Sequence, residues 1–326
     1  MRISVLITGA NGYVGRIALA ELMKSKGNMK TVVAHDIRIP KKEDQLPGVI
    51  YVEGDIRDEK LADIIAEHQI DTVVHLVSIV TPQKGEGRSF AYSVDVDGTR
   101  NLLEACIKNK VKKFIITSSG AVYGYYADSL EWLTENDPLR GNPEFAYSDH
   151  KRIQEEILQE YKQSHPELQQ LILRPGTIIG EATDNQIVDM FGRPIIIGIN
   201  GSSTPFVFIW DVDVARIIVK GICEENEGIY NVAGDGALTL KQLAEKVKKP
   251  YISVPLWLLR AILSVMHLLG ISKNGPEQLI FLQYRPVLLN KALKESFGYI
   301  PKFTSAQAFD YYLERNLNVE SIPKTK

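Results

Sequence analysis

The first half of the chain alternates short apolar runs with longer segments of helical periodicity. Apolar runs of about four to eight residues predict buried strands, whereas apolar positions three or four residues apart predict helices. We expect strands at Ile3–Ile7, Thr31–His35, Ile50–Glu53, Thr72–Leu76, Lys113–Thr117 and Leu171–Arg174. We expect helices at Val14–Lys24, Lys60–His68, Phe90–Asn109 and Tyr147–Gln163. This alternation predicts an α/β fold of the Rossmann type, a doubly wound parallel sheet with helices on both faces.

The regular alternation weakens after Arg174-Pro175, where Gly and Pro punctuate the chain. We therefore expect one sheet domain over residues 1–175 and a smaller C-terminal lobe over residues 176–326. A further strand pattern occurs at Ile229–Val232. Segments near residues 206–234 are thus expected to return to the main sheet.

The longest apolar stretch runs from Pro255 to Ile271 and carries Arg260 and His267. It is shorter than the roughly 20 mostly apolar residues that cross a bilayer. We therefore expect a buried or interfacial helix and no transmembrane segment. The apolar run near the N-terminus is too short for a signal peptide and meets glycine at once, which indicates a first strand.

The net charge and the cysteine content limit the kinds of partner and site that we expect. The formal net charge is −2, which provides no basic field for a polyanion, so nucleic acid is not an expected partner. The two cysteines, Cys106 and Cys223, are far apart, and neither a disulfide framework nor a Cys-x-x-Cys metal site is available. We expect no metal and a cytoplasmic location.

Three glycines, Gly9, Gly12 and Gly15, open the first predicted helix directly after the first strand. Without side chains in the way, backbone N–H groups and the helix dipole can face a pyrophosphate. This strand, turn and helix predict a dinucleotide site. Residues 1–175 then form the cofactor-binding domain, and residues 176–326 are mainly a substrate-binding lobe.

Asp36 lies at the end of the second predicted strand, about twenty residues beyond the glycines, where an acid can accept hydrogen bonds from an adenosine ribose. This position favours NAD over NADP. Arg16 and Arg38 keep NADP as the alternative, because either guanidinium can reach a 2′-phosphate.

Two further strand ends add candidate cofactor contacts. Asp55 follows the third strand, where its carboxylate can accept from an adenine amino group while Ile56 packs on the ring; the alternative is an N-cap, to which Asp58 is also suited. The fourth strand ends in His75-Leu-Val-Ser78, whose backbone is expected to line the cofactor. His75 itself is expected to be a packed strand-end histidine, since nothing nearby marks a metal site or a triad.

Tyr147 and Lys151 lie one helical turn apart. Oxidation of a secondary alcohol needs a base for the hydroxyl proton while hydride leaves to a nicotinamide. A tyrosine can be that base if its pKa falls from about 10 by two to three units. We expect the Lys151 ammonium and a positive nicotinamide to supply that shift, and Ser119, after the preceding strand, to hold the substrate oxygen.

The chain resembles the extended short-chain dehydrogenase/reductase family, the NAD-dependent epimerase/dehydratase group, over nearly its whole length. The matching segments are Thr8–Gly15, Gly54-Asp55, His75-Leu76, Val96–Ala105, Ser118–Gly124, Tyr147–Lys151, Leu173-Arg-Pro175, Tyr230–Gly234 and Phe297–Pro301. The resemblance implies that Ser119, Tyr147 and Lys151 are catalytic. The candidate cofactor residues are Gly9, Asn11, Gly12, Tyr13, Val14, Gly15, Asp36, Arg38, Asp55, Ile56, Leu76, Val77, Ser78, Tyr147, Lys151 and Pro175.

Departures from the family pattern bear on the reaction. Gly120-Ala121 stands where dehydratases carry an Asp-Glu pair, which disfavours dehydration. In the region where members bind a nucleotide diphosphate, Thr177 replaces an Asn and Phe206 replaces an Arg, whereas Arg285 matches a second Arg. Thr177 and Arg285 are therefore the candidate substrate residues. Asp95 likewise replaces the usual Asn beside the cofactor.

These features leave three hypotheses open for the function of the protein, and the first two assume a small-molecule substrate. The first is an NAD-dependent oxidoreductase that resembles a sugar-nucleotide 4-epimerase. The second is a net dehydrogenase or reductase of an apolar alcohol or ketone, favoured if Phe206, Phe208, Trp210 and Trp257 line a pocket rather than pack in the core. The third is a non-catalytic scaffold that only binds the dinucleotide. A homodimer through the helices at 90–109 and 147–163 is a further hypothesis.

Overall fold

The computed structural model describes residues 2–80, 87–183, 186–269 and 279–316. Its centre is a seven-stranded sheet in the order β11-β6-β5-β4-β1-β2-β3, with all neighbours parallel. The strands are β1 (Ile3–Thr8), β2 (Met29–Asp36), β3 (Ile50–Glu53), β4 (Thr72–His75), β5 (Lys113–Thr117), β6 (Gln169–Pro175) and β11 (Gly228–Val232). The Rossmann-type prediction is confirmed, and the predicted strand ends differ from these by at most two residues.

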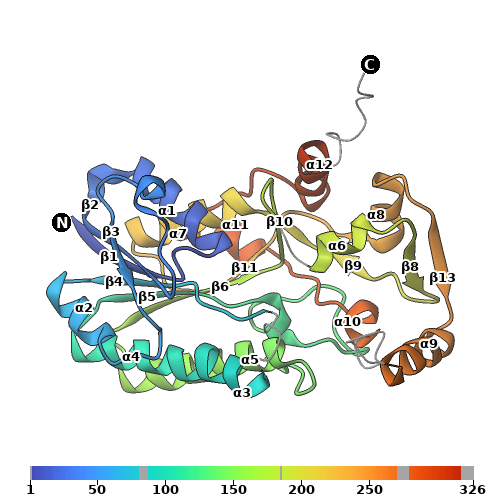
Figure 1. Ribbon diagram of the computed structural model, residues 1–326, viewed down its shortest axis with the longest axis horizontal. Coiled ribbons are helices and arrows are strands. Elements are labelled where there is room, and N and C mark those ends of the chain that lie inside the picture. Colours follow the sequence, from blue (N-terminus) through green and yellow to red (C-terminus); the bar gives the residue numbers. More distant parts are fainter. Residues whose placement is uncertain (1, 81–86, 184–185, 270–278, 317–326) are drawn as a thin grey trace.

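Helices cover both faces of this sheet (Figure 1). One face packs against α1 (Tyr13–Lys24) and α7 (Asp211–Cys223) through apolar side chains such as Leu19, Leu22 and Ile217. The other packs against α2 (Leu61–Glu67), α4 (Gly98–Lys108) and α5 (Ala146–Ser164). Because both faces are covered, the strands are apolar runs rather than alternating patterns.

The helix expected at Phe90–Asn109 is present with an irregular centre. It comprises α3 (Arg88–Tyr92), a π-helical turn at Ser93–Asp97, and α4. A Cβ at Gly98 would lie 2.6 Å from a methyl group of Ile56, so glycine lets the helix approach the loop after β3. The periodicity predicted the extent of this helix but not its π turn, which is a feature often found at functional sites.

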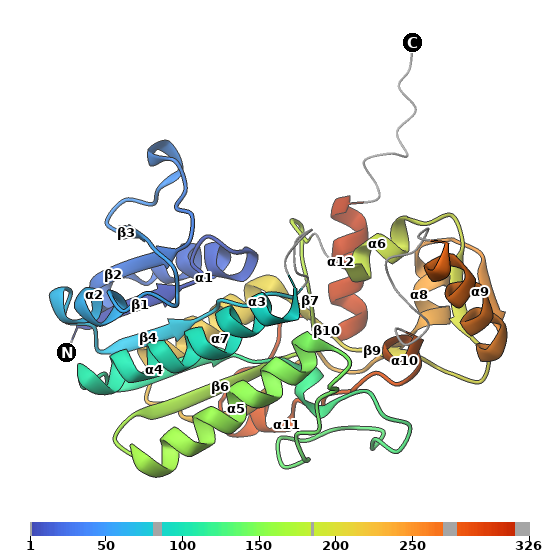
Figure 2. The same cartoon turned by 60° about the horizontal axis from the view of Figure 1, so that its bottom comes forward.

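The C-terminal lobe contains three small two-stranded sheets and short helices (Figure 2). The strand pairs are β7 (Thr177–Ile179) with β10 (Phe208–Trp210), β9 (Pro205–Phe206) with β12 (Leu238–Thr239), and β8 (Ile196–Ile199) with β13 (Tyr251–Val254). The helices are α6 (Gln186–Gly192), α8 (Leu240–Lys246), α9 (Leu256–Leu268), α10 (Leu279–Gln283) and α12 (Ser305–Asn316). A short α11 (Lys291–Glu295) packs back against β11 and the main core.

The lobe's aromatic residues separate into core and surface. Phe206, Phe208 and Trp210 are buried in one cluster with Phe309, so core packing explains these three. Trp257 is 71% exposed. The idea that all four line one apolar pocket is therefore wrong.

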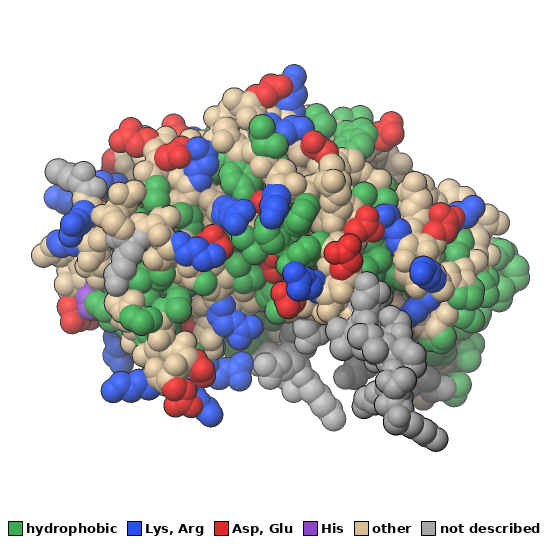
Figure 3. Space-filling model, turned by 90° about the horizontal axis from the view of Figure 1, so that it is seen from above, with side chains coloured by type: hydrophobic (Ala, Val, Ile, Leu, Met, Phe, Trp, Pro, Cys, Tyr) green, Lys and Arg blue, Asp and Glu red, His purple; other side chains and the backbone are tan. Residues whose placement is uncertain are grey.

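The helix predicted from the apolar stretch is α9, and it lies on the surface rather than in the core. Among its residues only Leu259 is buried, so a buried helix is excluded; Ile271, the end of the stretch, lies outside the described residues. In the described part of the chain, no helix combines the length and the apolar character that crossing a membrane requires. Elsewhere the surface is mixed, and Figure 3 shows Lys/Arg and Asp/Glu side chains interspersed over one face.

A buried ion pair links the end of β6 to α5. The Arg174 guanidinium donates to both carboxylate oxygens of Glu155, at 2.6 to 3.1 Å, and both side chains are 2% exposed. Ser118 also donates to Glu155, and Arg174 donates to the hydroxyl of Tyr123. Because the charges are fully paired, removal of either one would leave the other buried alone.

A second buried network ties β1, β4 and α4 together through His75. Thr99 donates to the carbonyl of Asp95 and accepts from Gln154, so the Nε2–H of His75 must donate to Thr99. The other ring nitrogen then accepts from Thr8 at 2.8 Å. Burial lowers the pKa of His75 to about 3, with the Lys151 charge acting in the same direction. His75 is a packed, neutral strand-end histidine, as predicted.

We predict that Glu155→Gln destabilises the fold by about 3 kcal/mol, because Arg174 keeps its charge without a counter-ion. Glu156→Gln is the matched control on the next position of the same helix. Glu156 forms only a surface pair with Arg152, so its change should stay within about 0.5 kcal/mol. Chemical denaturation of both variants measures this, and equal effects would contradict the role given to the buried pair.

We also predict that stability falls on acidification because of His75. Between a folded pKa of about 3 and the ordinary value of 6.5, the unfolded chain binds a proton that the folded chain excludes. The free energy of unfolding should therefore decrease as the pH drops below about 6.5, by up to ~1.4 kcal/mol per pH unit from this group. Denaturation curves at pH 7.5 and 5.0 should show a smaller difference for His75→Gln than for the native chain. His68→Gln, at a partly exposed histidine, is the control.

Candidate active site

The glycine turn after β1 is held by close backbone contacts. Gly9 adopts φ +73°, and a Cβ there would lie 2.8 Å from the carbonyl carbon of Leu76. A Cβ at Gly15 would lie 2.1 Å from the carbonyl oxygen of Gly9. Glycine is thus required both for the turn beside β4 and for the packing of α1 onto it. The turn lies where the strand order reverses, between β1 and β4, which is where doubly wound sheets bind ligands.

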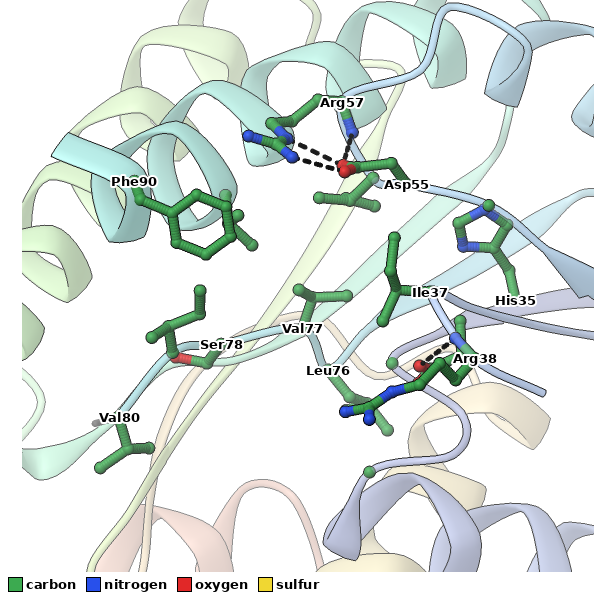
Figure 4. Close-up of a pocket in the computed structure, with 17 residues that line it drawn as sticks. His35, Ile37, Arg38, Asp55, Arg57, Leu76, Val77, Ser78, Val80 and Phe90 are labelled. Carbon is green, nitrogen blue, oxygen red and sulfur yellow. Dashed lines mark hydrogen bonds and ion pairs between the residues drawn. The ribbon is translucent and has the colours of Figure 1, made fainter. Parts of the chain in front are cut away.

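A cavity of about 610 Å³ opens at the carboxyl ends of β1, β2, β3 and β4 (Figure 4). Among the predicted cofactor residues, those that line it are Gly9, Gly12, Asp36, Arg38, Asp55, Ile56, Leu76, Val77 and Ser78. Further lining residues that the sequence reasoning missed are His35, Ile37, Arg57, Ile79, Val80, Phe90 and Val94. The missed residues adjoin predicted ones or come from the irregular helix, and no motif marks them.

The rim of the cavity carries the carboxylate of Asp36. One of its oxygens accepts from the backbone N–H of Asn11 at 2.9 Å, and the other accepts from the backbone N–H of Arg38 at 3.2 Å. The Asn11 side chain donates to the carbonyl of Arg38. Asn11 therefore shapes the turn rather than lining the cavity, and it fixes Asp36 where a ribose diol can reach it.

Asp55 and Arg57 form the opposite wall. Arg57 donates to both carboxylate oxygens of Asp55, and this contact lowers the pKa of Asp55. The Arg57 guanidinium also lies 5.3 Å from the ring centre of Phe90. Asp58, rather than Asp55, accepts from the backbone N–H of Lys60 at the start of α2. A flat ring in this part of the cavity would meet Ile56, Arg57 and Phe90.

Five predicted cofactor residues outside the catalytic group do not line this cavity. Asn11, Val14 and Gly15 belong to the turn and the first helix, and Pro175 ends β6 in register with Val232. Tyr13 lies at the start of α1, but its hydroxyl donates to Asp211 at 2.7 Å and lies 2.8 Å from Thr183. Tyr13 thus connects the cofactor domain to the start of α7, a contact that no sequence pattern predicts.

Ser119, Tyr147 and Lys151 come together at the end of β5. Ser119 caps the turn at Gly120–Tyr123 by accepting from the Ala121 N–H, and its side chain lowers the pKa of Tyr147. Lys151 is 2% exposed and donates to the carbonyl of Thr117 at 2.9 Å. Its ammonium lies 6.0 Å from the centre of the Tyr147 ring. Because β5 adjoins β4, this group is next to the strand end that forms the cavity wall.

The electrostatics of this group differ from the expected pattern. Desolvation raises the pKa of Tyr147 to about 12, and the hydrogen bond from Ser119 only partly offsets it. Burial lowers the pKa of Lys151 to about 8. The Lys151 ammonium donates to Thr117 rather than to the Tyr147 hydroxyl, and in the protein alone the pKa of Tyr147 stays above its ordinary value. Among the protein's own groups the tyrosine is a proton donor, and a further positive charge is needed to make it a base.

Asp95 has a partner that the sequence reasoning missed. Its carboxylate accepts from the backbone N–H of Ile79 at 2.9 Å and lies 3.1 Å from Nδ1 of His150. Both side chains are 1% exposed. The negative charge of Asp95 raises the pKa of Lys151 against the effect of burial. The residue that replaces the family's Asn thus helps to keep the lysine protonated.

The two candidate substrate residues are also adjacent. A guanidinium nitrogen of Arg285 lies 3.5 Å from the Thr177 hydroxyl, and the guanidinium carbon lies 4.1 Å from the ring centre of Phe206. Phe206 therefore stacks on the one retained arginine instead of providing a second positive charge. Burial lowers the pKa of Arg285.

A group of aromatic side chains includes the ring of Tyr147. The Phe281 ring, from α10, is 4.5 Å from Phe145 and 4.9 Å from Tyr125. Phe145 is in turn 5.9 Å from Tyr147. The candidate catalytic tyrosine is thus flanked by apolar rings from both parts of the chain.

Comparison with known proteins identifies a family and several relatives of this chain. Residues 5–233 match the family described as the NAD dependent epimerase/dehydratase family. The chain is 30% identical over 256 residues to an N-acetyl-alpha-D-glucosaminyl-diphospho-ditrans,octacis-undecaprenol 4-epimerase of Escherichia coli, which covers 76% of this chain and 72% of the relative. It is 25% identical to an uncharacterized protein of Mycobacterium tuberculosis, covering 94% and 82%.

Solved structures share the fold. The UDP-glucose 4-epimerase of Thermotoga maritima superposes with a TM-score of 0.75 at 19% identity, covering 97% of this chain and 99% of that one. The UDP-glucose 4-epimerase of Thermus thermophilus superposes with a TM-score of 0.73 at 22% identity, covering 99% and 100%. The family match extends over more than half of the chain and confirms the expected enzyme class. The chain belongs to the NAD-dependent epimerase/dehydratase family.

Proposed function

We propose that the protein is a 4-epimerase-like enzyme that transfers hydride reversibly at a secondary alcohol of a sugar nucleotide. The observation that carries this proposal is the meeting of Ser119, Tyr147 and Lys151 at the end of β5, beside the cavity. A relative named as a putative UDP-glucose 4-epimerase supports this substrate class. The 4-epimerase relative of Escherichia coli is named for a sugar that is joined through a diphosphate to undecaprenol, and it supports the 4-epimerase reaction. Gly120-Ala121 offers no acid pair for the removal of water.

The residues have separate roles in this proposal. Bound NAD supplies the hydride acceptor and donor. Ser119 hydrogen-bonds to the substrate oxygen, and Tyr147 removes the hydroxyl proton and later returns it. Lys151 holds a positive charge beside the pair, and its pKa of about 8 leaves it mostly protonated at neutral pH. The nicotinamide cation adds the charge needed to lower the pKa of Tyr147.

The cavity walls fit the cofactor. Gly9 and Gly12 leave the backbone open toward a pyrophosphate, and Asp36 is held by two amides at the position for a ribose. Ile56 and Phe90 provide apolar surface for an adenine. The Arg285 guanidinium, next to Thr177, is the group that would meet a substrate phosphate.

A net reductase of an apolar ketone is the second candidate. One observation favours it: the Phe145 ring lies beside Tyr147 and belongs to an aromatic group with Tyr125 and Phe281. The stacking of Phe206 on Arg285 also leaves one cation where sugar-nucleotide enzymes usually have two. Thermal-shift screening of the NAD-loaded protein with UDP-sugars and with apolar ketones separates the two candidates, because a bound ligand raises the melting temperature.

We predict that Tyr147→Phe lowers turnover by at least about a hundredfold, since the proton-transfer group is lost. NAD binding should stay unchanged. Tyr161→Phe is the matched control, because Tyr161 lies on the same helix α5 at a distance from Ser119 and Lys151. Turnover on the best UDP-sugar is the measurement. Full activity of Tyr147→Phe would contradict the catalytic role, and a native chain that binds NAD without turning over any sugar or ketone would favour a scaffold.

We predict that Asp36→Asn weakens NAD binding by about tenfold, because a hydrogen bond to a charged acceptor is worth roughly 1.5 to 3 kcal/mol. The selectivity against NADP should shrink in the same variant. Calorimetric titration with both cofactors measures this, with Asp44→Asn as the control at an exposed site between β2 and β3. An unchanged preference would show that Asp36 does not select the cofactor.

A further inference from the structure

Helix α9 has three distinct faces along its length. Leu256, Leu259, Leu263 and Met266 face the lobe, where Leu259 packs with Ile199 and Leu279. A narrow polar strip carries Arg260, Ser264 and His267. At 100° per residue, the remaining apolar side chains spread over about 140° of the helix circumference.

This third face is apolar and exposed; we call it the α9 face. It consists of Trp257, Leu258, Ile262, Val265, Leu268 and Leu269, which are 71%, 36%, 44%, 56%, 86% and 65% exposed. Single exposed apolar residues are ordinary on protein surfaces, whereas a contiguous group marks an interaction site. The α9 face is therefore a candidate interaction surface.

The neighbouring sheet adds to the apolar character of this end of the lobe. Ile197 of β8 and Ile252 of β13 are opposite each other in register and are 45% and 47% exposed. β13 leads through Pro255 directly into α9. Hydrophobic side chains gather at this end of the molecule in Figure 3, the end that carries β13 and α9 in Figure 1.

The charges of this region favour an anionic partner. Between Glu245 and Glu277 the sequence has no Asp or Glu and has five Lys or Arg residues, of which Lys246 is paired with Asp310. Arg260 is exposed on the polar strip that borders the α9 face. A second copy docked on the same face across a two-fold axis would add another Arg260 beside this face and no acidic residue from this segment to pair with it. An anionic surface would complement it.

We propose that the α9 face docks the protein on the surface of a lipid bilayer that contains anionic lipids. A helix with an apolar face and basic residues beside it lies in the plane of the interface, and a tryptophan such as Trp257 suits that boundary. At 13 residues α9 is about 20 Å long, so it lies on the bilayer and does not span it. This inference does not depend on the reaction proposed above.

Docking would place the active site close to the membrane-facing end. Residues 279–283 of α10 pack near α9 through the cluster of Leu259 and Leu279. Phe281 of the same short helix contacts Phe145, which lies beside Tyr147. Helix α9 and the candidate catalytic tyrosine are thus connected through the short helix α10.

Co-sedimentation with vesicles tests the proposal. The full chain should sediment with vesicles of phosphatidylcholine mixed with phosphatidylglycerol, and much less with phosphatidylcholine alone. Trp257→Gln and Leu268→Gln should each weaken binding by about tenfold, because the helix loses buried apolar area. Ile300→Gln, at a side chain that is 76% exposed elsewhere, is the matched control and should bind like the native chain.

A second experiment tests the contribution of positive charge to vesicle binding. Arg260→Gln should reduce binding to the anionic vesicles by several-fold, and added salt should do the same to the native chain. The melting temperature of each variant shows whether the fold is kept. Absence of vesicle binding, or equal binding by all variants, would overturn the proposal. A dimer in light scattering that Leu268→Gln dissociates, without vesicle binding, would assign the α9 face to a second copy instead.

Discussion

The close approach of α1 to the end of β1 is the constraint on which the cofactor site depends. Gly9 and Gly15 leave no room for a Cβ, so the chain turns tightly and the helix begins directly above the strand. The strand order reverses between β1 and β4, and the crevice at the carboxyl ends of these strands therefore lies beside this turn. The ends of the parallel strands then place Asp36, Asp55 and Ser78 around one cavity, although they are far apart in sequence.

Burial governs the charges beside this cavity. It raises the pKa of Tyr147, which keeps the phenol protonated, and it lowers that of Lys151 to about 8, which leaves the ammonium mostly protonated at neutral pH. Asp95 partly offsets the effect on Lys151 and is itself held by Ile79 and His150. A positively charged cofactor ring would lower the pKa of Tyr147, and the acid/base chemistry would therefore depend on cofactor binding.

Much of the cofactor domain could be predicted from sequence because its signals are local. Strands β3 and β5 are short apolar runs with the predicted ends, and the glycine turn follows β1 without an interval. The spacing of Tyr147 and Lys151 and the position of Ser119 after a strand also predict this group, and the structure brings the three residues together at the end of β5. These features depend on neighbours within a few residues or on the common edge of parallel strands.

What the sequence did not reveal depends on contacts between distant residues. The hydroxyl of Tyr13 donates to Asp211, which lies 198 residues further along the chain. Arg285 stacks on Phe206 only because the folded lobe brings the two residues together. Apolar composition alone could not separate the buried Phe206 from the exposed Trp257. Periodicity likewise predicted α9 but not which of its faces is covered.

Deuterium at C4 of UDP-glucose tests the central claim, that hydride leaves and returns at a secondary alcohol carbon, most directly. The account predicts that the protein forms UDP-galactose with the deuterium kept at C4, as followed by NMR, without net reduction of NAD. Loss of the deuterium to solvent, or accumulation of an oxidised sugar with NADH, would contradict epimerisation by reversible hydride transfer.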